Sequence, residues 1–464
     1  MTHLQYFYEI SKIPRPSGSE EKIAQYLCDF AKKHGLEYYT DENRNVLINK
    51  PASAGYENAP AFCLQGHTDM VCEKEISSTH DFTSDPIQIY EKDGKLSANG
   101  TTLGADDGAA IGIMLALLES TEPMPRLQCL FTAEEETGLF GASSFDYSKI
   151  YADYMINIDG EEEGEILTSC AGGLRVKMQK QLEVKNANNC VKITVSGLAG
   201  GHSGSDINKN RANASVIMLQ LIKRAKAPLC FFEGGSKENA ITPYAVSVVE
   251  GDAEQIRKYA DELVNELKGG LCPEDMSLEI TVEPTKTLCS ISLDETMALC
   301  NMMQEIKHGV IRMSDDMEGF VSTSANVGVV KIENGSVYIC VSVRSENDDE
   351  KYAVYEEYDA VCRKYGFSCE QGQGYPGWRF RKESRLRTLY AKAYKQVTGK
   401  DIKISAIHAG LECGLISGAL PSLDIIAIGP DMSFVHTTAE YIDISSFDRV
   451  FETVRLCLKT AIEI

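Results

Sequence analysis

Positive charge is scarce in this sequence. Its 464 residues include 46 Lys and Arg against 68 Asp and Glu, which gives a formal net charge of −22. Nucleic-acid backbones and anionic membranes are bound by positively charged surfaces, so we expect neither nucleic acid nor membrane as a partner. Hydrophobic residues make up 43% of the chain and charged residues 25%, the usual composition of a soluble globular protein.

Long apolar runs and cysteine pairs are also missing. No run of about 18 apolar residues occurs, and the N-terminal segment lacks the basic and apolar regions of a signal peptide. The 15 cysteines are scattered without a CxxC pair. Cys63, Cys129 and Cys340 lie inside apolar runs, where free cysteine behaves as a small buried hydrophobe. So many unpaired thiols fit a reducing compartment, and we therefore expect a cytoplasmic protein.

Several motifs that define large enzyme classes do not occur. The chain has no HExxH, no Walker A sequence, no GxGxxG after a strand pattern and no GxSxG. The glycine-rich segment 197–204, GLAGGHSG, follows a strand pattern, but no lysine completes a phosphate site there. These absences argue against the metalloproteases, nucleotide-binding proteins and serine hydrolases that carry those motifs.

The first third of the chain predicts an α/β domain. Short apolar runs at 61–66, 127–133 and 154–159 are typical of buried strands, and the apolar segment 108–120 predicts a buried helix. Ser17 to Glu20 has the spacing of a capping box before another helical pattern. Apolar strands that alternate with buried helices indicate a mostly parallel sheet sandwiched by helices.

The pattern changes near residue 185 and changes back after residue 377. A chain of this length is expected to form two or three domains. Between these points we predict a smaller α+β unit, which includes a hairpin at Asn334-Gly335, and segment 371–378 resembles a linker. Buried-strand patterns return at 402–407 and 423–429. We therefore predict a first domain formed by 1–184 and 378–464, split by an inserted domain, 185–377.

Acidic residues and histidines follow the predicted strands of the split domain. The carboxyl ends of strands in α/β sheets meet at one edge, where ligands and metals bind. The residues delivered to this edge are His67, Asp69, Asp106, Asp107, Glu134, Glu135, Glu136, Asp159 and His436.

Imidazole and carboxylate are ligands of Zn²⁺, Mn²⁺ and Co²⁺, and a carboxylate can bridge two ions. Consecutive glutamates in a dry pocket would repel one another unless cations neutralised them. Each element alone has an ordinary alternative: a structural histidine, a solvated acidic loop or a helix N-cap aspartate. Their coincidence in one α/β domain predicts a metal site.

The same segments resemble a known family. HTDMVCEK, TLGADDG, TAEEETG, NIDGEEEGEI, SCAGG, GGHSGSDI, GLECG and SFVHTTAE occur in order over nearly the whole chain. They are similar to the dinuclear zinc peptidase family that includes carboxypeptidase G and succinyl-diaminopimelate desuccinylase. Within it, HTDMVCEK and GLECG resemble the aminoacyl-histidine dipeptidases, cytosolic relatives of the carnosinases. The resemblance implies a catalytic di-metal peptidase domain in 1–184 and 378–464, and a lid and dimerisation domain in 185–377.

The resemblance also implies a set of metal ligands. His67 and Asp159 would bind one ion, Glu136 and His436 the other, and Asp106 would bridge the two. Two divalent ions are implied, with Zn²⁺ first and Co²⁺ or Mn²⁺ as alternatives.

Two further acidic residues take catalytic roles by resemblance. Asp69 would orient the imidazole of His67, and Glu135 would act as general base toward a hydroxide that bridges the metals. Most relatives have Asp-Glu-Glu where this chain has Glu134-Glu135-Glu136. Aligning on the following Thr-Gly makes the last two glutamates the working pair, and a shift by one residue stays open.

Substrate groups need their own partners. A dipeptide carboxylate requires several donors, for which Arg344, Asn239 and Asn326 are candidates, each with a structural surface or turn role as the alternative. Glu412 is a candidate for the α-amine, by charge and by resemblance. His202 resembles the family histidine that stabilises the tetrahedral intermediate. In dimeric relatives this histidine reaches the active site of the partner subunit, so the resemblance implies a homodimer.

We therefore expect metal-dependent hydrolysis of small peptides, as an Xaa-His or broad-specificity cytosolic dipeptidase. The same metal core could serve an N-acyl amino-acid deacylase, since both reactions cleave an amide. A third hypothesis is a non-catalytic metal-dependent assembly protein, which would be expected to have lost a ligand or the base.

Overall fold

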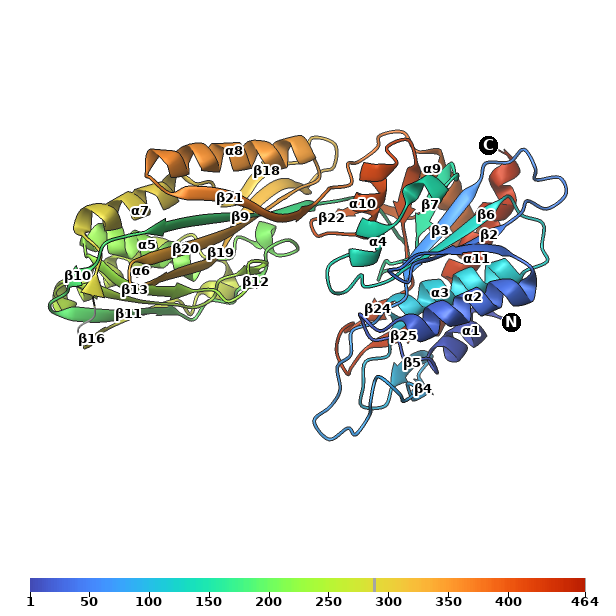
Figure 1. Cartoon of the computed structure of the whole chain (residues 1–464), viewed down its shortest axis with the longest axis horizontal. Coiled ribbons are helices and arrows are strands. Elements are labelled where there is room, and N and C mark those ends of the chain that lie inside the picture. Colours follow the sequence, from blue (N-terminus) through green and yellow to red (C-terminus); the bar gives the residue numbers. More distant parts are fainter. Residues whose placement is uncertain (287–288, 464) are drawn as a thin grey trace. The chain divides into compact units, whose positions relative to one another are not determined.

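The computed structural model describes residues 1–286 and 289–463, which form two compact units (Figure 1). The first unit comprises Met1–Ser169, Phe380–Ala406 and Leu411–Ile464, and the second comprises Cys170–Arg379 and Ile407–Gly410. The assignment of a catalytic and a lid domain to 1–184 with 378–464 and to 185–377 stays a prediction. Within the described residues, every helix is too short or too polar to cross a membrane.

The first unit is built on a mixed sheet in the order β1-β2-β6-β3-β7-β23-β8-β22. Its central strands β6, β3, β7 and β23 run parallel, and β1, β2 and β8 pair antiparallel toward the edges. The bounds are β1 (Glu37–Thr40), β2 (Val46–Lys50), β3 (Phe62–His67), β6 (Leu127–Thr132), β7 (Tyr154–Asn157), β8 (Glu165–Cys170), β22 (Lys403–Ile407) and β23 (Asp424–Ala427).

Helices cover both faces of this sheet, and its central strands are buried on both sides. Leu64 of β3 faces one cluster of buried side chains, to which α1, α2, α3, α9 and α11 contribute. Its neighbour Gln65 points to the opposite face, where it donates to Glu412 of α10. The bounds are α1 (His3–Ile10), α2 (Glu21–His34), α3 (Ala105–Glu119), α4 (Phe140–Ser144), α9 (Arg385–Thr398), α10 (Glu412–Ala419) and α11 (Ile444–Thr460). The predicted α/β class is confirmed.

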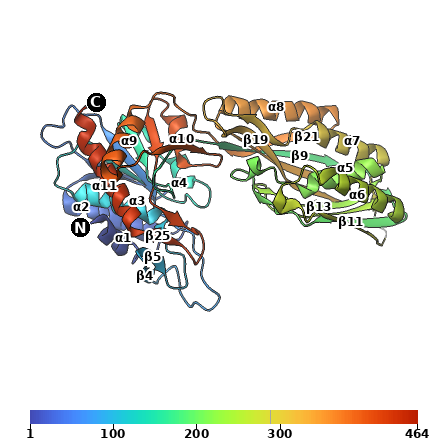
Figure 2. The same cartoon turned by 180° about the vertical axis from the view of Figure 1, so that it is seen from behind.

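A small sheet and two short helices complete the first unit. The sheet has the order β24-β25-β5-β4, and β24 leads directly to the loop that carries His436. In the reverse view, α9 and α11 lie against each other (Figure 2). The remaining bounds are β4 (Ile89–Lys92), β5 (Lys95–Ala98), β24 (Met432–Ser433), β25 (Tyr441–Asp443), η1 (Tyr147–Lys149) and η4 (Ala461–Glu463).

The second unit is an antiparallel sheet with helices packed on one face. Its strands follow the order β16-β11-β15-β13-β19-β20-β9-β21, with β18 paired to β19, and α5 to α8 contribute to one apolar core with it. The hairpin predicted at Asn334-Gly335 joins β19 to β20. The bounds are β9 (Gly172–Gln181), β10 (Lys185–Asn186), β11 (Cys190–Ser196), β12 (Gly201–His202), η2 (Ile207–Lys209), α5 (Ala214–Ala225), β13 (Leu229–Gly234), β14 (Ala240–Ile241), β15 (Ala245–Glu250), α6 (Ala253–Leu267), η3 (Pro273–Asp275), β16 (Glu279–Pro284), β17 (Cys289–Ser290), α7 (Leu293–Glu305), β18 (Gly309–Met313), β19 (Val321–Glu333), β20 (Ser336–Ser345), α8 (Asp348–Lys364) and β21 (Ser368–Tyr375).

Two local predictions were wrong. Helix α2 begins at Glu21, with Glu20 as its N-cap and no side-chain cap. Ser17 therefore lies before the helix, where its hydroxyl donates to the carboxylate of Asp69. Segment 371–378 is a linker only in its last residues, because β21 pairs with β9 up to Tyr375. The glycines of this segment do not prevent the pairing, since strands pair through main-chain groups, which glycine also has.

Candidate metal centre

The predicted acidic residues and histidines converge at the carboxyl edge of the parallel strands. His67 ends β3, Glu135 and Glu136 follow β6, and Asp159 follows β7. Three sets of ligand atoms each lie within 4.8 Å of one another: His67, Asp106 and Asp159; His67, Glu135 and Glu136; and Asp106, Glu136 and His436. His67, Asp106 and Glu136 each belong to two sets, so the three sets form one continuous centre.

The carboxylate of Asp106 lies between two imidazoles. Its Oδ1 is 2.8 Å from Nε2 of His67, and its Oδ2 is 3.1 Å from Nε2 of His436. His436 Nε2 also lies 2.9 Å from Oε1 of Glu136, and His67 Nε2 lies 3.5 Å from Oδ1 of Asp159. Burial opposes ionisation of Asp106, but the bonds from His436 and His67 outweigh it and hold its pKa well below the ordinary value.

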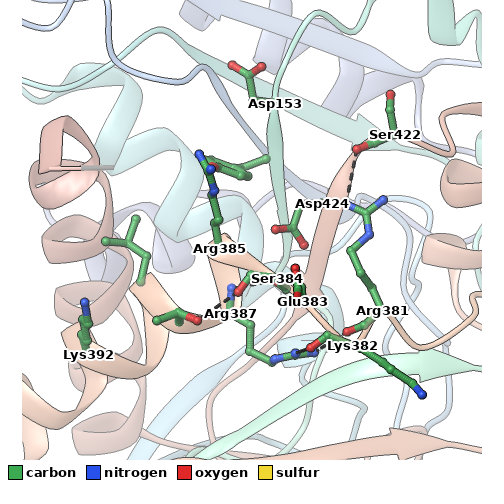
Figure 3. Close-up of a pocket in the computed structure, with 13 residues that line it drawn as sticks. Asp153, Arg381, Lys382, Glu383, Ser384, Arg385, Arg387, Lys392, Ser422 and Asp424 are labelled. Carbon is green, nitrogen blue, oxygen red and sulfur yellow. Dashed lines mark hydrogen bonds between the residues drawn. The ribbon is translucent and has the colours of Figure 1, made fainter. Parts of the chain in front are cut away.

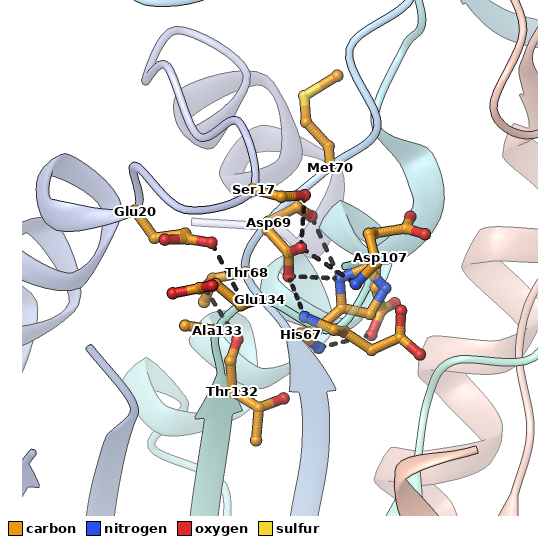
Figure 4. A network of polar contacts seen from close by, with 12 residues as sticks. Ser17, Glu20, His67, Thr68, Asp69, Met70, Asp107, Thr132, Ala133 and Glu134 are labelled. Atoms are coloured by element: carbon orange, nitrogen blue, oxygen red, sulfur yellow. Dashed lines mark hydrogen bonds and ion pairs between the residues drawn. The ribbon is translucent and has the colours of Figure 1, made fainter. Parts of the chain in front are cut away.

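Asp69 links the segments on which this centre is built (Figure 4). Its buried carboxylate accepts the backbone N–H groups of Glu135 at 3.0 Å and Glu136 at 3.2 Å, and the hydroxyl of Ser17 at 2.7 Å. Its Oδ1 also lies 3.4 Å from Nδ1 of His67. Nδ1 of His67 is also 3.2 Å from the backbone carbonyl of Asp69, so Asp69 contacts the imidazole through two groups and its carboxylate holds the backbone of the two glutamates.

The first of the three glutamates is bound elsewhere. The carboxylate of Glu134 forms an ion pair with Arg44, and Arg44 also lies 3.1 Å from Oε2 of the buried Glu20. The backbone N–H of Glu134 donates to Glu20 at 3.2 Å. Glu135 and Glu136 are left to face His67. This arrangement favours the alignment that makes the last two glutamates the working pair.

The centre concentrates more negative charge than the protein atoms around it balance. Burial raises the pKa of Asp159 to about 6 and holds those of Glu135 and Asp107 well above their ordinary values. Burial lowers the pKa of His67, but bonds to Asp106, Asp159 and Asp69 outweigh it and raise that pKa well above normal. Buried carboxylates and imidazoles of this kind are the donor set of divalent metal ions, so the residues fit a dinuclear metal centre.

Comparison with known proteins agrees with this geometry. The sequence model of peptidase family M20/M25/M40 matches residues 63–460. The chain belongs to this family. The M20 peptidases are dinuclear metal enzymes, and the predicted resemblance to them is confirmed.

Two relatives match this M20 chain over nearly its whole length. It is 35% identical to the cytosol non-specific dipeptidase of Escherichia coli over 98% of this chain and 96% of that protein. The structure of aminoacylhistidine dipeptidase from Vibrio alginolyticus superposes with a TM-score of 0.91 at 32% identity, covering 99% of this chain and 96% of that one. A probable succinyl-diaminopimelate desuccinylase of Staphylococcus aureus is 26% identical over 61% of this chain and 67% of that protein.

Glu412 is a buried carboxylate in the first unit with one unused oxygen. Its Oε2 accepts the amide of Gln65 at 2.5 Å and the hydroxyl of Thr132 at 2.7 Å. Its Oε1 is buried and has no hydrogen-bond partner among the described residues. Burial raises the pKa of Glu412 to about 7, and the negative charges of Asp159 and Asp69 add to this effect. An unpaired buried acceptor of this kind calls for a cationic or donor partner.

The second unit brings two other predicted residues together. Nη2 of Arg344 lies 3.5 Å from Nε2 of His202, and Nη1 donates to the hydroxyl of Tyr375 at 3.0 Å. Burial and the charge of Arg344 lower the pKa of His202, so this imidazole is neutral near pH 7. His408 is buried in the same unit, and its Nε2 lies 2.7 Å from the hydroxyl of Ser324.

The two predicted asparagines differ in their surroundings. The amide of Asn326 is buried and donates to the carbonyl of Ala240 at 2.8 Å, which is a structural use of its donor. Asn239 is exposed, and its backbone carbonyl accepts the N–H of Ser203 at 2.9 Å. Their roles toward substrate stay predictions.

A separate groove lies in the first unit at the amino ends of the parallel strands, opposite the ends that carry the metal centre (Figure 3). It has a volume of about 890 Å³ and includes Tyr154 and Asp424, the residues at which β7 and β23 begin. Arg385 and Lys392 of α9 also line it. Because ligands of α/β sheets bind at the carboxyl ends of the strands, this groove does not compete with the metal centre as the catalytic site.

Sequence reasoning missed several residues that hold the centre. Arg15, Arg44 and Glu440 bind its loops from distant segments. The signal available was weak: Arg15 and Ser17 stand in an IPRPSG segment whose prolines predict an irregular turn. Nothing in their local pattern indicates which loop they contact.

We predict a pH-dependent contribution of His436 to the stability of chelator-treated protein. Bonds to Asp106 and Glu136 raise its pKa to about 10 from an ordinary value of 6.5. Since the folded pKa is the higher one, the stabilisation is complete below pH 6.5 and is lost as the pH rises toward 10. The difference in unfolding free energy between wild type and His436→Gln should therefore shrink over this range. The same substitution in an Asp106→Asn background should show a weaker trend, and a constant difference would contradict the assignment.

Proposed function

We propose that this M20 protein is a metal-dependent dipeptidase of Xaa-His or broad specificity. The observation that carries the proposal is the carboxylate of Asp106, which offers one oxygen to each of two imidazoles. This is the arrangement required of a ligand that bridges two ions. Support also comes from two full-length relatives described as dipeptidases.

We assign His67 and Asp159 to one ion, Glu136 and His436 to the other, and Asp106 to both. These residues match the first and third sets of neighbouring ligand atoms. Zn²⁺ is the metal we propose, because imidazole and carboxylate at low coordination number suit it, with Co²⁺ or Mn²⁺ as substitutes. Asp69 holds the ring of His67, as outer carboxylates do in such sites.

Glu135 is the proposed general base and acid. When bound, two divalent ions would polarise the scissile carbonyl and lower the pKa of the attacking water. Glu135 accepts the proton of that water on its carboxylate and then donates it to the leaving amine. Burial holds the pKa of Glu135 well above its ordinary value, and the positive charge of two bound ions would act against this effect. The fixed backbone bond from Glu135 to Asp69 keeps the carboxylate at the centre.

The ends of the dipeptide are recognised by different groups. Oε1 of Glu412 accepts the α-ammonium. Of the two carboxylate oxygens, Oε2 already has a donor, whereas Oε1 is buried without one among the described residues. Arg344, with Asn239 and Asn326, serves the carboxylate, and His202 stabilises the tetrahedral intermediate. The proposal includes a homodimer whose inserted domain serves as lid and dimer interface, and a cytoplasmic location.

The first test is turnover of dipeptides. Ala-His and Gly-Gly should be hydrolysed in the presence of Zn²⁺ or Mn²⁺, and N-acetyl amino acids far more slowly, because only the former carry the ammonium that Glu412 binds. Removal of metal with a chelator should abolish turnover, and adding metal back should restore it. Faster cleavage of N-acetyl amino acids would favour the deacylase, and absence of both activities would favour the assembly protein.

The three consecutive glutamates should differ sharply on substitution. Glu135→Ala should keep both metals but lower kcat by about 100- to 10,000-fold, the usual contribution of a general acid–base. Glu136→Ala should lose one metal ion, measured by elemental analysis. Glu134→Ala is the matched control and should stay near wild-type activity, because its carboxylate binds Arg44. Loss of turnover with both metals kept in Glu134→Ala, together with loss of a metal in Glu135→Ala, would show that the base was placed one residue late.

Glu412 should determine the requirement for a free α-amine. Glu412→Gln removes the charge but can keep the bonds from Gln65 and Thr132, so the fold should be retained. A bond to a charged group contributes about 1.5–3 kcal/mol, so kcat/KM for Ala-His should fall by about 10- to 100-fold. Hydrolysis of N-acetyl-Ala-His, which lacks the ammonium, provides the control and should change little. An equal fall for both substrates would rule out recognition of the amine.

A further inference from the structure

The backbone that carries Asp106 is not held by its own helix. Asp106 lies in the first turn of α3, yet its φ of −80° and ψ of 108° are not helical. The ordinary ladder of helical hydrogen bonds therefore cannot fix the position of this carboxylate. Other groups must do so, and two buried charged side chains outside the metal centre contact this segment.

Glu440 binds the segment from its N–H side. Its buried carboxylate accepts the N–H groups of Leu103 at 2.7 Å, Gly104 at 3.1 Å and Ala105 at 2.8 Å. Gly104 is the N-cap of α3 and Ala105 its first residue, so two of these groups are unpaired donors of a helix N-terminus, where an anion is stabilised. Glu440 stands four residues after His436, so it also ties the loop of His436 to that of Asp106.

Arg15 binds the same segment from its carbonyl side. Its fully buried guanidinium donates to the carbonyl of Gly104, and also to those of Thr68 at 3.0 Å and Asp69 at 2.9 Å. One side chain thus joins the loop after His67 to the loop before Asp106. Burial lowers the pKa of Arg15, and the negative charge of Glu440 acts against this effect.

There is no spare room between these partners. Gly104 has a φ of +70°, and a Cβ built on it would lie 2.6 Å from Nη2 of Arg15 and 2.8 Å from Sδ of Met70. The side chain of Arg15 is therefore packed against the loop as well as bonded to it. The loop has little freedom to move while both charges are in place.

We propose that Arg15 and Glu440 are positioning residues that set the metal affinity of this centre. Together they hold the segments of His67, Asp106 and His436 at the spacing that two ions require. They contact neither ion nor substrate and act through the backbone. The inference rests on the proposed function only in the assignment of these three residues as metal ligands.

The test is Zn²⁺ binding to chelator-treated protein, measured by isothermal titration against a competing chelator, for wild type, Arg15→Lys and Glu440→Gln. Loss of an outer partner of a metal ligand costs about 10- to 100-fold in affinity, and we expect a loss of this size for at least one of the two ions. Arg455→Gln is the matched control, because it breaks another ion pair of the first unit, with Glu122, which precedes the amino end of β6, whereas the ligands follow the carboxyl ends of the strands. Thermal unfolding of each chelator-treated variant shows whether the fold is retained.

The outcomes separate the inference from the proposed function. Folded variants with weakened Zn²⁺ binding, beside a control with wild-type affinity, support it. Unchanged affinity in both variants, or an equal loss in the control, overturns it while leaving the dipeptidase intact. Wild-type protein that binds no Zn²⁺ would overturn the metal assignment itself. If Glu440→Gln fails to fold, Glu440→Asp, which keeps the charge but shortens its reach, must bind Zn²⁺ more weakly than the control.

Discussion

The central physical constraint in this protein is the crowding of buried carboxylates at one edge of a parallel sheet. Asp106, Asp159, Glu135 and Glu136 lie together with two histidines. Carboxylates in such a site cannot all be ionised unless positive charge is close. Hydrogen bonds from the surrounding loops hold these carboxylates close together although they repel one another. Divalent cations would neutralise the repulsion.

Hydrogen bonds to the backbone, rather than contacts among the acidic side chains, maintain this geometry. Asp69 accepts N–H groups of the glutamate segment, and Glu440 accepts those of the Asp106 segment. Arg15 donates to carbonyls of two loops at once. A carboxylate that accepts several N–H groups is stabilised in its ionised form without a metal ion. Asp69 and Glu440 can therefore hold their loops in place whether or not a metal is bound.

The residues proposed to act in the reaction come from both compact units. The proposed metal ligands and Glu412 belong to the first unit, and Arg344 and His202 belong to the second. The neutral state of His202, imposed by burial and by Arg344, allows its imidazole to donate or accept a hydrogen bond without carrying charge.

Much of the fold and of the centre was predictable from the sequence because the relevant signals are local. A buried strand is a short apolar run, and the residues that follow it are delivered to the sheet edge, so the positions of His67, Glu136 and Asp159 placed them at one edge. Which of the candidates there bind metal was implied by the family resemblance and stays a prediction. The predicted cap at Ser17 was wrong because helix α2 begins later, at Glu21, and the predicted linker at 371–378 was wrong in part because most of it pairs with a neighbouring strand.

Only the tertiary structure decided which glutamate Arg44 binds, which oxygen of Glu412 is free, and what holds the Asp106 loop. Glu440 and Leu103 are 337 residues apart in the chain, and no local pattern encodes such a contact.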